Sequence, residues 1–249
     1  MEVHAHTHTP RKKWTHYFWE FFMLFLAVTL GFFVENQREH YIEVKREKQY
    51  VQSLIQDLKE DTTYLQNAVN THNLSCRMID TLISLLNDSN RDQLTGHIYF
   101  LARIIPFLDQ NILLHDKTFE QLKNSGGLRL IRRQSVLNDI SRYYEKYKWI
   151  TAGPSVMEIR NRQELFLTLE KLFDMRVFQQ MLHSPNPFKP LEPETDPALL
   201  SHDAQIINSV CARYHFMYGT KKVLQNSADD LLTTASHLIE ILKKEYQLK

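Results

Sequence analysis

Cysteine is scarce in this chain of 249 residues. The two cysteines, Cys76 and Cys211, fit neither a disulfide-rich scaffold nor a zinc site. Both occupy apolar positions of predicted helices, where buried, reduced thiols are common. A disulfide between them would need an oxidising compartment and Cα atoms within about 7 Å of each other. The sequence therefore leaves both states of the cysteines open.

Recognisable catalytic motifs are also missing. The chain contains no HExxH, no paired ExxH, no glycine-rich phosphate loop and no signature of a serine or cysteine nucleophile. No cofactor is therefore expected. The scattered carboxylates Asp57, Glu60 and Asp61 are expected to lie on the solvated face of a helix.

Neither sign of charge is in excess, because 30 Lys and Arg residues face 29 Asp and Glu residues and the net charge is +1. This balance gives no support for nucleic acid or an anionic surface as a partner. One stretch combines the basic letters "RLIRR" with Tyr143, Tyr144 and Tyr147. A solvated basic turn beside an aromatic core stripe explains it better than a nucleic-acid interface.

The chain does contain one long apolar run near its N-terminus, "WTHYFWEFFMLFLAVTLGFFVEN" over residues 14–36. From Phe21 to Val34 fourteen residues carry no charge, and extension back to Tyr17 gives eighteen, interrupted once by Glu20. Eighteen helical residues span roughly 27 Å, close to the ~30 Å hydrocarbon core of a bilayer. The run therefore predicts a transmembrane helix over residues 17–35.

A cleaved export signal and a buried helix of a soluble domain are the alternatives for this run. The basic "RKKW" before it is typical of a signal, but "VENQREH" after it offers no small-x-small cleavage site. The run is also apolar on every face. An uncleaved signal anchor is therefore predicted, and the basic residues directly before it favour a cytoplasmic N-terminus. The protein is expected to be a single-pass protein of a bacterial inner membrane with a periplasmic C-terminal domain.

Residues 1–16 form a His-rich, basic tail. His4, His6 and His8 alternate in "HAHTH" and are weak candidates for metal ligands, because imidazoles at this spacing can bind Zn, Ni or Cu. Within the predicted span, Glu20, Ala27 and Gly31 fall along one face. The small pair allows another helix to pack closely. The predicted partners are the lipid bilayer and either a second copy or another membrane protein.

Helical periodicity dominates residues 36–249. No glycine or proline occurs between Glu35 and Thr95, and apolar residues recur there at steps of seven and four, which predicts a long amphipathic helix. The turn-forming "NDSNRD" is expected to end it. The main line of this helix consists of Val51, Leu58, Leu65, Ile79 and Leu86, with His72 at the remaining step.

Turn and cap signals divide the rest of the chain. Thr118 has capping-box spacing to Gln121, "SGG" over residues 125–127 predicts a helix end, and Ser135 is expected to cap the next helix. "AGPS" over residues 152–155 predicts a break, and residues 184–197 hold five of the 8 prolines and predict a long loop. Strand alternation is absent, so the predicted fold is all-α: the transmembrane helix, the long amphipathic helix and an antiparallel helical bundle.

Three segments together carry a resemblance: "EFFMLFLAVTLGFFVENQREH", "KREKQYVQSLIQDLKEDT" and "TFEQLKNSGGLRLIRRQSVLNDISRYY". Over roughly residues 18–147 the chain resembles an uncharacterised family of single-span helical membrane proteins from Bacteroidetes, which carry a domain of unknown function. The resemblance implies a membrane location and an all-helical fold. It implies no activity, cofactor or catalytic residue.

Two classes of function follow. The first is a membrane-anchored helical module for interaction or sensing. The second is an enzyme or metal-binding protein whose site assembles in three dimensions and leaves no linear motif. A deep polar pocket with several perturbed titratable groups would favour the enzyme. Exposed apolar patches on the bundle would favour the interaction module.

Overall fold

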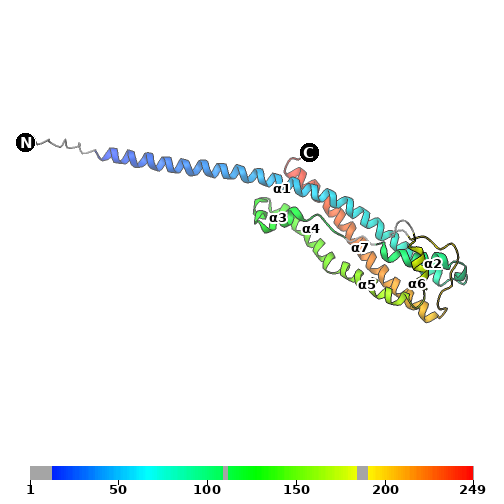
Figure 1. Cartoon of the computed structure of the whole chain (residues 1–249). Helices are drawn as coiled ribbons and strands as arrows, with labels where there is room; N and C mark the ends of the chain where they lie inside the picture. Colours follow the sequence, from blue (N-terminus) through cyan, green and yellow to red (C-terminus); the bar gives the residue numbers. More distant parts are fainter. Residues whose placement is uncertain (1–12, 109–111, 184–189, 249) are drawn as a thin grey trace, which may run out of the picture. The chain divides into compact units, whose positions relative to one another are not determined.

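The computed structural model describes residues 13–108, 112–183 and 190–248. Within them the chain is all-helical, without strands, which confirms the predicted fold class (Figure 1). The chain divides into two compact units, Met1–Gln49 and Tyr50–Lys249. The helices are α1 (Trp14–Leu86), α2 (Thr95–Ile104), α3 (Lys117–Asn124), α4 (Gln134–Ala152), α5 (Pro154–Leu169), α6 (Met175–Met181) and α7 (Ala204–Glu245).

The first unit contains the N-terminal part of α1 and the apolar run. Its large side chains are exposed along the whole run, from Trp14 at 83% through Phe21 at 66% to Phe32 at 74%. Among the described residues, α1 is the one helix long and apolar enough to cross a membrane, and none of that stretch is buried within the protein. The finding is compatible with a membrane anchor or a signal sequence.

The second unit takes its core from the C-terminal part of α1. The predicted main line is buried, with exposures of 1% or less at Val51, Leu58, Leu65, His72, Ile79 and Leu86. One half of the core joins α1 to α3, α4 and the C-terminal half of α7, and the other joins it to α2, α5, α6 and the start of α7. Burial of these side chains, at about 25 cal/mol per Å² of apolar surface, is the main force that holds the unit together.

Helix ends follow the predicted breakers closely. α1 ends at Leu86, directly before "NDSNRD". Gly126 has a φ of +68°, the left-handed geometry expected after α3, and Gly153 separates α4 from α5, which begins with Pro154. After this break, α5 ends at Leu169 and α6 begins at Met175, so the helical stretch before the proline-rich loop is interrupted.

Both predicted caps are wrong. Thr118 lies inside α3, and its backbone N–H donates to Oδ2 of Asp57 on α1 at 3.3 Å, so a carboxylate from another helix does what the capping box was expected to do. Ser135 lies inside α4, because that helix begins one residue earlier, at Gln134.

The proline-rich segment is a loop wherever the structure describes it. Residues 184–189 lie outside the described residues, and 190–203 contain no helix. The backbone N–H of Gly96 on α2 donates to Oδ1 of Asp196 at 2.9 Å. A Cβ at Gly96 would lie 2.8 Å from the carbonyl oxygen of Thr195. The loop therefore packs on α2 so closely that only glycine fits there.

Candidate functional site

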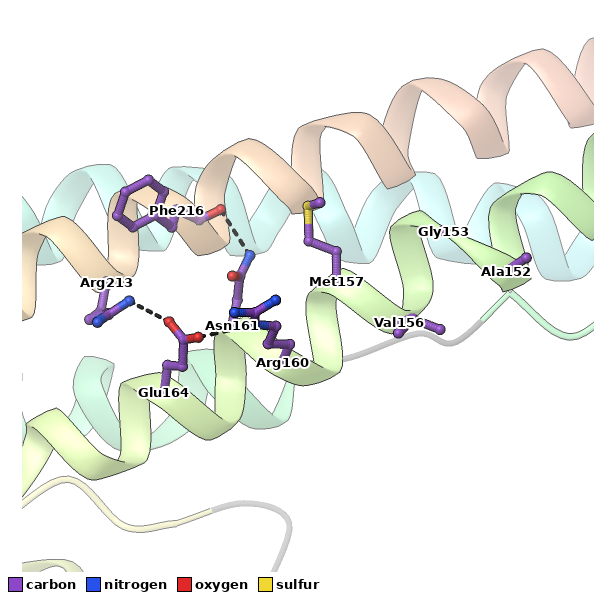
Figure 2. Close-up of a pocket in the computed structure, with 9 residues that line it drawn as sticks. All are labelled: Ala152, Gly153, Val156, Met157, Arg160, Asn161, Glu164, Arg213 and Phe216. Carbon is purple, nitrogen blue, oxygen red and sulfur yellow. Dashed lines mark hydrogen bonds and ion pairs between the residues drawn. The ribbon is translucent and has the colours of Figure 1, made fainter.

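A groove runs along the seam between α5 and α7 (Figure 2). Two adjoining hollows of about 420 and 700 Å³ make it up, and both are lined by Gly153, Met157, Asn161 and Phe216. Volumes of this size are typical of sites for small ligands. Because the two hollows share these residues, we treat them as one surface, called here the α5/α7 groove.

The two helices run antiparallel along the groove. Residues of α7 contribute at steps of three and four, which places them on one face of the helix. Nδ2 of Asn161 on α5 donates to Oγ1 of Thr220 at 2.6 Å and to the carbonyl of Phe216 at 3.4 Å. Glu164, three residues after Asn161 on α5, forms an ion pair with Arg213, which precedes Phe216 and Thr220 on α7. The α7 residues that line the groove are Arg213, His215, Phe216, Gly219, Thr220 and Val223.

One end of the groove is polar and basic. Oε2 of Glu164 accepts a hydrogen bond from Arg213, and its Oε1 accepts one from Nε of Arg160 at 3.1 Å. Two guanidinium groups thus share one carboxylate, which leaves these three side chains with a charge of +1. The Arg160 side chain is 77% exposed, so its remaining N–H groups face solvent.

The other end of the groove is apolar, and its large side chains are exposed. Exposure is 61% at Trp149, 58% at both Met157 and Phe216, and 44% at Val223. A single exposed apolar residue is ordinary, but a contiguous group around a hollow marks an interaction or ligand site. The bundle therefore presents the exposed apolar surface that favours an interaction module.

The residues of a buried ion pair are the sequence neighbours of two groove residues. Nζ of Lys221, next to Thr220, is 3.0 Å from Oε1 of Glu158, next to Met157, and the two side chains are only 0% and 2% exposed. Nζ of Lys221 also donates to the carbonyl oxygen of Leu108 at 3.1 Å. The hydroxyl of Ser75 donates to the same carbonyl oxygen, also at 3.1 Å. These contacts tie α7, α5, α1 and the chain after α2 together.

A second buried polar group contradicts the prediction that Asp61 is solvated. Asp61 is 0% exposed, and its Oδ1 accepts from the backbone N–H of His115 at 2.8 Å and lies 2.9 Å from Nδ1 of the same residue. Its Oδ2 accepts from the hydroxyl of Tyr143 at 2.9 Å. Of the other two carboxylates expected in solvent, Glu60 is exposed and Asp57 is half-buried. Asp61 thus anchors the segment before α3 to the core.

The charge state of Asp61 gives a testable pH dependence. Burial raises the pKa of Asp61, although the hydrogen bonds from His115 and Tyr143 oppose this shift. Just above a pH of about 3.9, the ordinary pKa of an aspartate in an unfolded chain, Asp61 therefore still holds its proton in the folded chain but has lost it in the unfolded chain. The contribution of Asp61 to the unfolding free energy therefore falls as pH rises from about 3.9 through the folded pKa, and is constant above it.

Asp61→Asn provides the comparison, because asparagine does not titrate. Urea unfolding of both proteins at a series of pH values should show the native chain losing stability relative to Asp61→Asn across this window. A native chain that instead gains stability relative to the variant would mean that the Asp61 pKa is lowered in the fold.

The residues that the sequence proposed as metal ligands or as a helix-packing face lie in different parts of the chain. His4, His6 and His8 lie outside the described residues. Within the described ranges, no group of three or more His, Cys, Asp or Glu side chains is arranged to hold a metal. Glu20 lies 3.2 Å from Nε2 of His16, and Ala27 and Gly31 are exposed.

Cys76 and Cys211 are free, buried thiols, and burial raises the pKa of each. Of the two alternatives that the sequence left open, the structure has the reduced one. A raised thiol pKa lowers the fraction of reactive thiolate, so neither cysteine is suited to act as a nucleophile.

The groove and both buried polar groups escaped the sequence analysis, although weak signals existed. Asp61 follows Leu54 by seven residues and precedes Ala68 by seven, so it occupies a core position. Lys221 lies four residues after Met217 and three before Leu224, both buried. A charged residue that lies three, four or seven residues from buried apolar residues of the same helix is a signal for a buried, paired charge.

Comparison with protein-family models, curated proteins and solved structures finds no match to this chain. The resemblance to the Bacteroidetes family therefore stays a prediction.

Proposed function

We propose that this protein is a membrane-anchored helical module that binds a partner or ligand through the α5/α7 groove. The groove carries the proposal, because its exposed aromatic and aliphatic side chains surround a hollow with a few convergent polar groups. The apolar run of α1, exposed along its length, supports attachment to a lipid bilayer.

The proposed location is a bacterial inner membrane, with a cytoplasmic N-terminus and the helical domain in the periplasm. The basic residues before the run support this orientation. A reporter that is active only in the periplasm, fused after Lys249, should be active, and activity of a cytoplasmic reporter there would reverse the orientation.

The proposed partners inside the bilayer are a second copy of the chain or another membrane protein. The face formed by Ala27 and Gly31 supports this, since no atom beyond the adjoining residues and the backbone of α1 itself lies within 4 Å of a Cβ built at Gly31. Changing both residues to Leu should weaken crosslinking between spans in intact membranes. Unchanged crosslinking would remove this face from the proposal.

The binding role of the groove is tested by a photo-crosslinking amino acid placed at position 157 of the full chain in living cells. Met157 lines both hollows, so light should produce a defined adduct there. The same probe at Asn67, exposed on α1, is the control and should give no such adduct. An adduct at both positions, or at neither, would contradict binding at the groove.

A further inference from the structure

From the layout of the groove we infer the chemistry of its ligand: a single-chain amphiphile with a carboxylate head, that is, a free fatty-acid anion. The inference rests on the proposed function, since it requires the groove to be a binding site. Its support comes from the charge at one end, the apolar surface at the other and the glycine between them.

The basic end suits a carboxylate with a single charge. Arg160 and Arg213 share Glu164, and together they retain a charge of +1. A guanidinium group has five N–H donors in a planar fork that matches a carboxylate. Arg160 uses one of them, its Nε–H, on Glu164 in the described structure. A ligand carboxylate at this end would neutralise the excess charge.

The apolar end suits one extended hydrocarbon chain. Arg213 and Val223, at the two ends of the groove on α7, are ten residues apart, or about 15 Å along the helix. Between them the lining is mostly apolar, with Pro154, Met157 and Phe216. A chain lying there would cover side chains that are otherwise in water, which is favourable in proportion to the area covered.

Gly219 is the feature that keeps this path open. Glycine is less favourable than alanine inside a helix, yet α7 continues through Gly219 without a break. Apart from the adjoining residues and the backbone of α7 itself, no atom lies within 4 Å of a Cβ built there, so no neighbouring group requires a glycine. Its missing side chain instead leaves the wall of the larger hollow open.

A two-chain phospholipid and a second copy of the protein fit these features less well. The groove is one seam between two helices and offers one path, and its basic end has one excess charge. A protein surface would place separate carboxylate and apolar side chains against it, whereas one fatty-acid chain reaches from the charged end to the apolar end. These two occupants are outcomes of the test.

The test uses the full chain in lipid nanodiscs and a long-chain fatty acid with a photoreactive diazirine near its methyl end. After light, mass spectrometry should find adducts on groove peptides that contain Met157 or Val223, and also on the apolar run of α1. The run serves as an internal control, because it contacts lipid chains whatever the groove does.

Gly219→Leu should remove the groove adducts and leave those on the run unchanged. Gly219→Ala is the matched control and should keep the groove adducts, since a methyl group leaves most of the path free. Both variants remove a helical glycine, so both should fold, which thermal unfolding checks.

Competition by unlabelled compounds tests the head group. Dodecanoate should displace the probe from the groove at a concentration about tenfold lower than dodecanol, which has the same chain and no charge. Arg160→Gln should remove most of this preference. Each methylene added to a shorter acid should strengthen binding by up to about fourfold until the groove is filled.

Three results would overturn the inference. A diazirine phospholipid that labels the groove as well as the fatty acid would indicate a bilayer lipid. Equal competition by dodecanol and dodecanoate would show that the groove does not recognise the carboxylate head of the ligand. If the groove is not labelled but position 157 gives a protein adduct in cells, the fatty acid is refuted while the proposed function stands. If neither the labelling nor the adduct is found, both the fatty acid and the proposed function are refuted.

Discussion

Glu158→Gln is expected to lower the unfolding free energy of the helical domain by about 3–5 kcal/mol, because it leaves Lys221 charged and without its carboxylate in the core. Lys221 is 0% exposed, so water cannot replace the lost partner. Urea unfolding of the full chain in nanodiscs, followed by circular dichroism, would show the change as a lower midpoint with a similar slope.

The double variant Glu158→Leu with Lys221→Met is the control. It removes both charges together, and replacement of a buried ion pair by apolar side chains of similar size is often neutral or stabilising. Most of the lost stability should therefore return. If Glu158→Gln unfolds at the native midpoint, the pair does not hold α5 and α7 together as the structure indicates.

Leu26→Arg with Val28→Arg is expected to release the protein from the membrane. Each arginine near the centre of a span costs about 2.5–3.5 kcal/mol, so the pair costs roughly 5–7 kcal/mol. The Phe, Leu and Val residues of the run favour insertion by only roughly 3–6 kcal/mol in total. Fractionation of cells should then find the variant among soluble or degraded proteins.

Leu26→Ile with Val28→Ile is the matched control for that experiment and should remain in the membrane, because both changes keep the run apolar. If the double-arginine variant stays in the membrane as well, the apolar run is not what holds the protein there.

Much of the fold could be predicted because periodicity reports burial directly. The line from Val51 to Leu86 repeats every seven residues and is buried throughout. Gly126 and Gly153 were found at helix ends because glycine favours the conformations that stop a helix. The cap at Thr118 was missed because Asp57, which accepts a hydrogen bond from the N–H of Thr118, lies 61 residues away in the chain.

The site could not be predicted in the same way. Glu158 and Lys221 each resemble an ordinary surface charge until the packing of α5 against α7 brings them together. The groove depends equally on this packing, since Met157 comes from α5 and Phe216 from α7. The sequence signal closest to it was Gly219, a glycine inside the long helix α7, which lines the larger hollow.

The measurement that tests the central claim most directly is alkaline carbonate extraction of membranes from cells that express the native chain. Carbonate strips proteins bound by charge or by contact with other proteins and leaves those whose apolar segments lie in the bilayer. The structure exposes the whole apolar run of α1, so the native chain should stay in the membrane pellet. Recovery of the native chain in the carbonate supernatant would contradict a membrane-anchored module.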